Sequence, residues 1–309
     1  MYNNILQNQI VQFAHQIGID FIGFSKVEFL TNEAKRLEKW LKENQHGSMK
    51  WMENYFDKRT NPALLVDDAK TVISVGINYF PESQQNCKSP KISKYAYGRD
   101  YHFVLKEKLF ALADFIPKNT GKINFRAFVD SAPIMDKVWA NRAGIGWQGK
   151  HTNIINKHAG SYFFLGELVL DVAFEYNTKA TDHCGTCTRC IDACPTQAIE
   201  KPYQLNAQKC ISYLTIELRD LIPDEFKTKM DNWMFGCDIC QDVCPWNSKA
   251  KPTTEVQFKP IDQILNFTFD DWEEVTADIF NKFAKESPLK RTKLSGIKRN
   301  LKFLRDSAS

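Results

Sequence analysis

Eight of the nine cysteines lie in, or between, two short runs with regular spacing. The first run contains Cys184, Cys187, Cys190 and Cys194, and a proline follows the last of them. This is the C-x2-C-x2-C-x3-C-P pattern of bacterial ferredoxins, in which three cysteines bind one iron–sulfur cluster and the fourth binds another. The run therefore predicts two 4Fe–4S clusters, which carry electrons one at a time.

The second run ends in the same way but is one cysteine short. Cys237, Cys240 and Cys244 keep the spacing, whereas Met234 stands where the pattern requires its first cysteine. Cys210 lies alone between the runs and can supply the missing thiolate. With crossed ligation, one cluster is expected on Cys184, Cys187, Cys190 and Cys244, and the other on Cys194, Cys210, Cys237 and Cys240.

Other chemistries suit these cysteines less well. A disulfide framework is typical of small secreted domains, whereas this chain has 309 residues and begins without a signal-peptide pattern. Zinc sites usually use two C-x2-C pairs, and neither run closes in that way. Cys87 matches no ligand pattern and is interpreted as a loop thiol. Free thiolate ligands and the missing export signal favour a location in the cytoplasm.

The elements that must position these cysteines follow from the hydrophobic pattern. Apolar residues recur with helical spacing over residues 3–17 and 101–116, and β-branched residues predict a central strand over residues 70–80. Thr31 is expected to cap a further helix. The pattern then predicts a strand over residues 125–130, a helix over 134–142, and a strand pair over 153–155 and 162–170.

The sequence therefore divides into three parts with different predicted structures. Residues 1–175 mix helices and strands and predict an α/β domain, residues 176–250 form a ferredoxin-like cluster module, and residues 251–309 are helical and end basic. A two-cluster module does not need so large a domain in front of it, so the chemistry is expected in residues 1–175. No apolar run reaches the roughly 18 residues needed to span a bilayer, so no membrane association is expected.

Asp130 stands at the end of the strand predicted over residues 125–130, where α/β proteins often carry functional side chains. The alternative is that it caps a helix opened by Pro133, and the local pattern favours the cap. His102 and His151 are equally open, because an isolated histidine is more often structural than a ligand.

A glycine-rich stretch follows the helix predicted over residues 134–142. Gly144, Gly146 and Gly149 spell G-x-G-x-x-G, the pattern of dinucleotide-binding proteins. That site requires a strand before the glycines and a helix after them. Because a helix precedes them here, the stretch does not predict a dinucleotide site.

Taken together, these segments resemble the epoxyqueuosine reductase family over nearly the whole chain. The matching segments are both cysteine runs and residues 130–137, 144–153, 160–167, 210–217 and 287–300. The resemblance implies an enzyme that reduces epoxyqueuosine to queuosine at the wobble position of tRNA, the last step of queuosine biosynthesis. It also implies cobalamin held without its lower base, and it makes Asp130 the expected proton donor for the departing epoxide oxygen.

The resemblance further implies binding residues and partners. The corrin pocket is expected to involve Arg59, Asp130, Gln148, Lys150, His151, Thr152 and Asn153, with Ser212 on the cluster side. Electrons are expected from a flavodoxin or ferredoxin system, and the protein is expected to act as a monomer. Many family members continue into a helical-repeat domain, whereas this sequence stops at Ser309, so a short form with weaker tRNA contacts is expected.

A basic stretch near the C-terminus fits an RNA substrate. Lysines and arginines there alternate with apolar residues, and the expected tRNA contacts are Lys290, Arg291, Lys293, Lys298 and Arg299. A basic amphipathic helix suits phosphate contacts and makes binding depend on salt. The alternative is a solvated charged face, which is the usual outcome of a charge run.

Three other functions stay open on the sequence. An electron-transfer protein would carry iron but no corrin. A corrinoid reductive dehalogenase would share the cofactors but would have no need of the basic C-terminus. An RNA-binding module with structural clusters would leave Asp130 and residues 144–153 unexplained. Cofactor analysis and tRNA binding together distinguish these alternatives from an epoxyqueuosine reductase.

Overall fold

The structure is a computed structural model that describes residues 2–117 and 121–308, so the outer ends of the expected first and third parts, residues 1 and 309, lie outside it. The α-helices are α1 (Tyr2–Gln16), α2 (Thr31–Lys42), α3 (Phe56–Thr60), α4 (Tyr101–Phe115), α6 (Asp136–Arg142), α7 (Arg189–Asp192), α8 (Ile211–Ile216), α9 (Ile239–Asp242), α10 (Asp262–Asn266), α11 (Phe269–Glu274), α12 (Ala277–Ala284) and α13 (Lys293–Ala308). The strands are β1 (Phe21–Lys26), β2 (Thr71–Asn78), β3 (Lys91–Ile92), β4 (Phe125–Phe128), β5 (Trp147–Gln148), β6 (Ile154–Ile155), β7 (Phe163–Leu170), β8 (Ile199–Lys201), β9 (Gln204–Leu205) and β10 (Trp233–Phe235).

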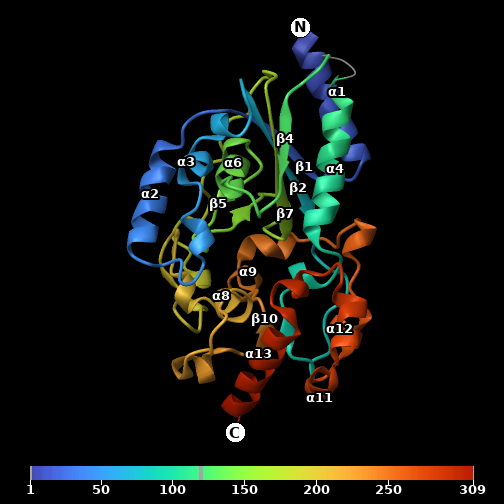
Figure 1. The fold of residues 1–309 in the computed structure, drawn as a ribbon. Coiled ribbons are helices and arrows are strands. Elements are labelled where there is room, and N and C mark those ends of the chain that lie inside the picture. The colour runs from blue at the N-terminus through green and yellow to red at the C-terminus, as the bar shows by residue number, and fades with distance from the viewer. Residues whose placement is uncertain (1, 118–120, 309) are drawn as a thin grey trace.

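A four-stranded antiparallel sheet with the order β1-β2-β7-β4 forms the centre of the N-terminal half (Figure 1). Its middle strands are rich in β-branched residues such as Val72 and Val169, which favour extended backbone and are fully buried here. In the register, Glu167 of β7 lies opposite Ser74 of β2 on one side and Phe128 of β4 on the other. Side chains at these three positions therefore share one face of the sheet.

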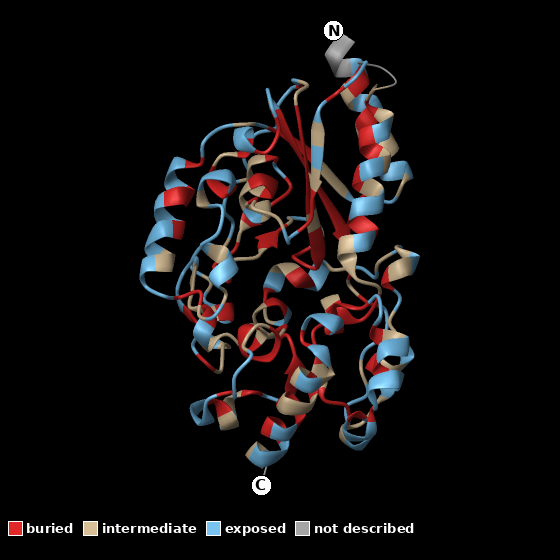
Figure 2. Cartoon of the chain, in the orientation of Figure 1, coloured by how far each residue is buried: buried red, intermediate tan, exposed pale blue. Residues whose placement is uncertain are grey.

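Helices cover both faces of this sheet, as Figure 1 shows. α1 and α4 pack on one face, where Ile10, Leu105 and Leu109 are fully buried. α6 packs on the other face, where Trp139 is fully buried in a cluster with Val72 and residues of β4 and β7. Burial is concentrated on the strands and the inward sides of the helices (Figure 2). The sheet and α6 thus fix the ends of the loop that carries Asp130.

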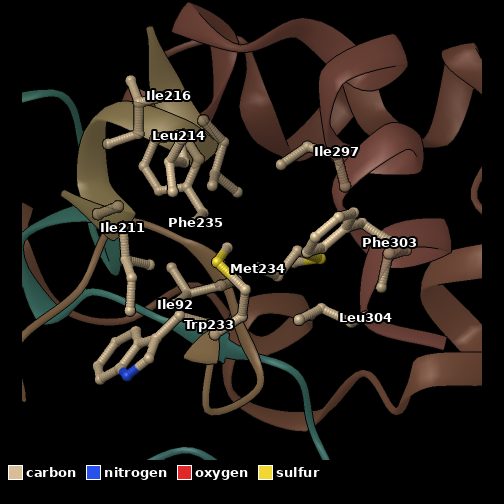
Figure 3. Packing of buried hydrophobic residues seen from close by; sticks show 14 of the residues in the cluster. Ile92, Ile211, Leu214, Ile216, Trp233, Met234, Phe235, Ile297, Phe303 and Leu304 are labelled. Carbon is tan, nitrogen blue, oxygen red and sulfur yellow. The ribbon is translucent and has the colours of Figure 1, made fainter. Parts of the chain in front are cut away.

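A second core fills the other half of the molecule. β3 pairs in parallel with β10, so residues 91–97 join a core that is built mainly from later parts of the chain. Met234 and Phe235 of β10 are fully buried, and Ile297 and Leu304 of α13 point into the same cluster (Figure 3). Met234 therefore has a packing role where the cysteine pattern lacks a ligand. The cysteine runs and the helical C-terminus share this half of the fold.

Most predicted elements are confirmed with ends shifted by a few residues. The helices over 3–17 and 101–116 are α1 and α4, and the strands over 70–80, 125–130 and 162–170 are β2, β4 and β7. The C-terminal region is helical, as expected, with α10 to α13. Within the described residues, no helix combines the length and the apolar character needed to cross a membrane.

Two local predictions were wrong. Thr31 does not cap α2: it is the first helical residue, Leu30 takes the cap position, and no side chain there bonds to the helix end. Residues 153–155 do not pair with β7, because β6 pairs with β5 instead. Gly146 permits this close pairing because it has no side chain. A Cβ atom at this position would lie 2.3 Å from the Ile155 carbonyl oxygen. The glycine stretch follows α6, so the context of a dinucleotide site is absent, as expected.

Candidate active site and cluster sites

The cysteines line two cavities in two groups of four. The smaller cavity, of about 310 Å³, is lined by Cys184, Cys187, Cys190 and Cys244. The larger cavity, of about 570 Å³, is lined by Cys194, Cys210, Cys237 and Cys240. These groups are the two sets that crossed ligation predicts, and each offers the four thiolates that a 4Fe–4S cluster uses.

Short helices give the cysteines this arrangement. α7 carries Cys190 and α9 carries Cys240, and the two helices contact each other between the cavities. In each run the final cysteine follows this helical turn and lines the other cavity, so Cys194 and Cys244 are exchanged between the groups. Cys210 directly precedes α8, which brings it to the wall of the larger cavity. The crossing thus results from one helical turn in each run.

The thiols need a positively charged partner to ionise. Burial raises the pKa of Cys190 to about 11, and the nearby Cys244 and Cys184 raise it further. Burial also raises the pKa of Cys237 and of Cys240. Metal binding must displace these protons. A cationic iron core therefore suits the two groups, because it compensates four closely placed thiolates.

Lys150 lies beside the first group. It is buried, and its Nζ donates to the carbonyl oxygens of Gly185 at 2.6 Å and Cys187 at 2.9 Å. These bonds hold the loop of the first cysteine run against the glycine-rich stretch. Lys150 lines the smaller cavity rather than the larger one, so its position differs from the corrin contact that the family resemblance implied.

Asp130 lines the larger cavity together with the second cysteine group. It lies on the loop between β4 and α6 with a φ of +50°, and its side chain is 60% exposed. Tyr101 donates its hydroxyl hydrogen to Asp130 Oδ2 at 2.5 Å, and His102 Nε2 lies 3.7 Å from the same oxygen. The alternative of a helix cap is wrong, because α6 begins only at Asp136 and Met135 takes the cap position.

The groups around Asp130 are held from α4. Tyr101 stacks on Phe164 of β7 with ring centroids 4.3 Å apart, which fixes its hydroxyl over the loop. Burial and the adjacent Asp130 carboxylate raise the pKa of Tyr101 well above its usual range, so it remains a hydrogen-bond donor. His102 Nδ1 lies 2.7 Å from Asp100 Oδ1, which orients the imidazole. His102 is thus a neighbour of the candidate acid rather than an isolated histidine.

Four of the other residues that the resemblance implied also line the larger cavity: His151, Thr152, Asn153 and Ser212. Burial lowers the pKa of His151 to about 4, so this imidazole is neutral near pH 7. Its Nδ1 accepts the Asn153 backbone N–H at 3.1 Å, which leaves the proton on Nε2. Among the described residues, this buried Nε2 has no hydrogen-bond partner. His151 lines both cavities and so stands between the two cysteine groups.

Two implied corrin residues lie elsewhere. Gln148 lines a separate polar hollow with Lys137 and Trp147. Arg59 is buried, and its Nη2 donates to the Trp51 carbonyl oxygen at 3.4 Å. Burial lowers the pKa of Arg59, whereas the nearby carboxylates of Asp136 and Asp130 oppose this change. Arg59 therefore acts on the Asp130 loop by its charge.

Several cavity residues were not predicted from the sequence. Tyr101, Trp51 and Tyr213 line the larger cavity and come from three separate segments. The position of Tyr101 directly before His102 at a helix start could have drawn attention to it. No sequence signal identifies the other two, because aromatic residues are frequent in this chain.

The basic C-terminal residues divide into two kinds. Arg291 forms a bidentate pair with Glu217, at 3.0 and 2.9 Å, and Glu217 lines the larger cavity. Arg299 donates to the carbonyl oxygens of Leu214 and Asp220 at 3.0 and 2.8 Å, and Lys298 donates to those of Trp272 and Glu273. Lys290 and Lys293 are exposed. Three of the five expected tRNA contacts thus already form hydrogen bonds with other residues of the protein.

The fold and these cavities define a class of protein: an iron–sulfur oxidoreductase with two cluster sites in series and an acid at the inner one. Residues 183–247 match the family described as "4Fe-4S double cluster binding domain", which includes all eight cysteines of the two groups. Residues 59–131 match the family described as "Epoxyqueuosine reductase QueG, DUF1730", which includes Arg59 and Asp130.

Similar proteins and structures agree with these matches. Epoxyqueuosine reductase from Cellulophaga algicola is 56% identical over 292 residues, which cover 94% of this chain and 95% of the relative. Epoxyqueuosine reductase from Escherichia coli is 42% identical over 263 residues, covering 83% and 69% respectively. A crystal structure of epoxyqueuosine reductase with a tRNA-Tyr epoxyqueuosine-modified tRNA stem loop has a TM-score of 0.90 at 31% identity, covering 97% of this chain and 81% of that one.

A Bacillus subtilis epoxyqueuosine reductase, whose catalytic aspartate loop is swung out of the active site, has a TM-score of 0.89 at 30% identity and covers the same shares of the two chains. The identity to the Cellulophaga algicola relative extends over nearly the full length of both proteins. The chain belongs to the epoxyqueuosine reductase family. The resemblance inferred from the residues is therefore confirmed, as is the mixed α/β fold with its double-cluster module.

Proposed function

We propose that this protein reduces epoxyqueuosine in tRNA to queuosine. The observation that carries the proposal is a single cavity lined by Asp130 and by four cysteines of one cluster set. An epoxide that becomes an alkene takes up two electrons and two protons and releases water. Such a cavity supplies both needs, because clusters deliver electrons and a carboxyl group delivers protons. The activity for which the family is named and the related structure with a modified tRNA stem loop support this substrate.

For the clusters, we propose the two ligand sets that line the cavities. The first set lies near the surface, since Gly185, Thr186 and Arg189 beside it are exposed. Electrons are proposed to enter there and to pass inward to the second set. Lys249 lies over the Trp246 ring at 4.9 Å on the rim of this cavity, and Arg189 also lines it. A basic rim suits an acidic one-electron carrier of the flavodoxin or ferredoxin type.

The larger cavity is proposed to hold cobalamin. The fit rests on a buried donor of the cavity wall: among the described residues, His151 Nε2 has no protein partner. Arg59 Nε has none either, and its Nη2 donates to Trp51, which lines the cavity. Such donors suit the amide groups at the edge of a corrin, and Thr152, Asn153 and Ser212 add polar atoms to the wall. When bound, cobalamin supplies a strongly reducing metal centre next to the inner cluster.

Asp130 is proposed to protonate the departing epoxide oxygen. Tyr101 donates to Oδ2, which leaves Oδ1 free to carry the proton toward the substrate. In support, the Bacillus subtilis relative also carries its catalytic aspartate on a loop. The remaining corrin contacts expected from the sequence, Gln148 and Lys150, are proposed to act through neighbouring loops.

The first test is turnover by the purified protein. The protein, loaded with iron and cobalamin and reduced without oxygen, is incubated with a tRNA stem loop that contains epoxyqueuosine. Mass spectrometry of the nucleosides is expected to show loss of epoxyqueuosine and formation of queuosine. An unchanged nucleoside, with clusters and cobalamin shown to be present, would contradict the proposed function. Deletion of the gene in its host is expected to leave epoxyqueuosine in tRNA.

We propose further that the protein acts as a monomer in the cytoplasm, where its tRNA substrate is found. In support of a monomer, this chain by itself supplies the four cysteines of each cavity. The division into residues 1–175, 176–250 and 251–309 is kept as part of this proposal. The rival of a simple electron carrier does not account for a chain that belongs to a family of reductases.

Binding of tRNA is predicted to depend on the exposed lysines before and at the start of α13. Replacing Lys290 and Lys293 by glutamine is expected to weaken binding of the stem loop, because each replacement takes away a cation that can neutralise a phosphate. In a plot of the logarithm of the binding constant against the logarithm of the salt concentration, the slope is expected to become less negative. The change is about one for each phosphate that is no longer neutralised. Fluorescence anisotropy at several salt concentrations measures both the affinity and this slope.

The matched control changes the same charge elsewhere. Lys26 and Lys35 are exposed in the N-terminal half, and their replacement by glutamine lowers the net charge equally. This control is expected to leave the slope unchanged. Equal effects of both pairs would mean that the C-terminal lysines contribute only general charge, as in the alternative of a solvated face.

A further inference from the structure

A buried acid lies beneath the active-site loop and takes no part in the mechanism above. Glu167 of β7 is 0% exposed. Among the described residues, no N–H or hydroxyl group donates a hydrogen bond to either of its carboxylate oxygens. Ser74, opposite it on β2, also has a buried hydroxyl without a partner. Burial of an unpaired charge costs several kcal/mol. A charged Glu167 in this place would therefore be strongly destabilising, so its protonation state requires an explanation.

The explanation lies in its neighbour on α6. Glu167 contacts the carboxyl group of Asp136, and two carboxyl groups can form a hydrogen bond only if one of them holds a proton. Burial raises the pKa of Glu167 well above its usual range, and the charges of Asp136 and Asp130 raise it further. Burial raises the pKa of Asp136 as well. The pair therefore holds a proton to a higher pH than separate, solvent-exposed carboxyl groups do.

The other charged groups around this pair do not cancel the effect. Arg59 and Lys137 are cations that lie near Asp136 and Asp130, but neither is among the groups that act on Glu167. Arg126 of β4 shares the α6 face of the sheet, but it is exposed and lies over the Phe128 ring at 5.1 Å. Glu167 itself has no cation close enough to form an ion pair with it among the described residues. A retained proton is thus the remaining way to compensate the buried carboxyl group.

The pair is joined to the active-site loop. Asp136 Oδ1 accepts the backbone N–H of Asp130 at 3.3 Å, so one residue touches both Glu167 and the loop of the proton donor. The unpartnered oxygens of Glu167 and the Ser74 hydroxyl are polar partners of the kind that a trapped water requires. Asp136 therefore contacts both the buried Glu167 and the backbone of the loop that carries the Asp130 carboxyl group.

We propose that Glu167 and Asp136 form a buried carboxyl pair that returns a proton to Asp130 during each turnover. This inference rests on the proposed function, because that reaction uses two protons and Asp130 holds one at a time. In the step, an O–H bond of the pair breaks and an O–H bond forms on the Asp130 carboxylate, while no electrons move. The pair is then reprotonated from solvent after the product has left.

Glu167→Gln removes the proton and keeps the shape of the side chain. With bound iron and cobalamin unchanged, its kcat is expected to fall about 10²-fold, the lower end of what general acid catalysis supplies. Its kcat is also expected to fall with rising pH over the range where the parent protein is constant, because solvent alone must now return the proton. A purely structural role would lower kcat equally at every pH, and that result would overturn the proposal.

The matched control is Asp171→Asn, which makes the same change of carboxyl to amide directly after β7 and away from the loop. It is expected to leave kcat and its pH dependence unchanged. Failure of the parent protein itself to reduce epoxyqueuosine would instead contradict the proposed function. Normal turnover by Glu167→Gln, with an active parent protein, would overturn the carboxyl pair alone.

A second measurement does not depend on catalysis. The infrared C=O stretch of a protonated carboxyl group is expected in the parent holoprotein at pH 7 and is expected to be lost in Glu167→Gln. Its absence from the parent spectrum would overturn the proposal even if the variant failed to fold.

The stability of the variant should depend on pH in the same sense. The folded pKa of Glu167 lies above its unfolded value, so the parent protein loses stability as the pH rises from the ordinary glutamate range through the folded value. Glu167→Gln lacks this loss. Its Tm relative to the parent is therefore expected to increase as the pH rises. A difference in Tm that is independent of pH would show that Glu167 is not buried as an acid.

Discussion

Replacement of Asp130 by asparagine is expected to abolish measurable reduction of epoxyqueuosine while iron and cobalamin content stay intact. The amide keeps the size of the side chain and its contact with Tyr101 but has no acidic proton to give to the departing oxygen. Loss of a general acid typically costs about 10²–10⁴ in rate. Single-turnover conversion of the modified stem loop, followed by nucleoside mass spectrometry, measures the effect. Turnover at the parent rate would remove Asp130 from its proposed role.

The position of Asp130 explains why the loss should be confined to chemistry. Its side chain is 60% exposed in the larger cavity, so its replacement leaves no void in the core. The loop is held by Asp136 Oδ1, which accepts the Asp130 backbone N–H, and this bond does not use the Asp130 side chain. Tm and the binding of the stem loop are therefore expected to stay near their parent values.

Replacement of Cys210 by alanine is expected to have the second largest effect. The residue lies outside both cysteine runs, yet it lines the larger cavity with Cys194, Cys237 and Cys240. Without it, the inner cluster has three protein ligands, and a 4Fe–4S cluster is normally held by four. Iron content is expected to fall to about half, and transfer of electrons to the active site is expected to stop. Iron analysis and turnover of the modified stem loop measure the two effects.

Cys87 provides the matched control. It is a free, exposed thiol in a loop, and it lines neither of the cysteine cavities. Cys87→Ala is expected to keep the parent iron content and activity. Full iron content in Cys210→Ala would mean that another side chain supplies the fourth ligand, and it would contradict the assignment of Cys210.

The second cysteine group and the proposed proton donor are held by different halves of the fold. The second core, with β10 and α13, packs against Cys210 and Cys237 of the second cysteine group, whereas the sheet and α6 hold the loop of Asp130. The larger cavity lies where these halves meet and is lined from both. Electrons and protons thus reach the substrate from separate parts of the protein. This separation is why the replacements of Asp130 and Cys210 are expected to affect different measurements.

The sequence alone predicted the grouping of the eight cysteines and most of the helices and strands. Ligand spacing is a local property, because one helical turn between C-x2-C and the final cysteine decides which sulfurs can face one cluster. The same holds for β2, whose β-branched residues favour a strand wherever it packs. Membership of the family also followed from segments that could be read in order along the chain.

Other features were decided only by the tertiary structure. The local pattern favoured Asp130 as a helix cap, and the packing of α6 on the sheet placed it in the cavity instead. Arg299 looked like a phosphate contact, but it bonds to carbonyl oxygens some eighty residues earlier in the chain. The contact of Glu167 with Asp136 likewise joins two separate segments. Charge and hydrogen bonding act between atoms that are close in space, so spacing along the chain predicts them only within one element.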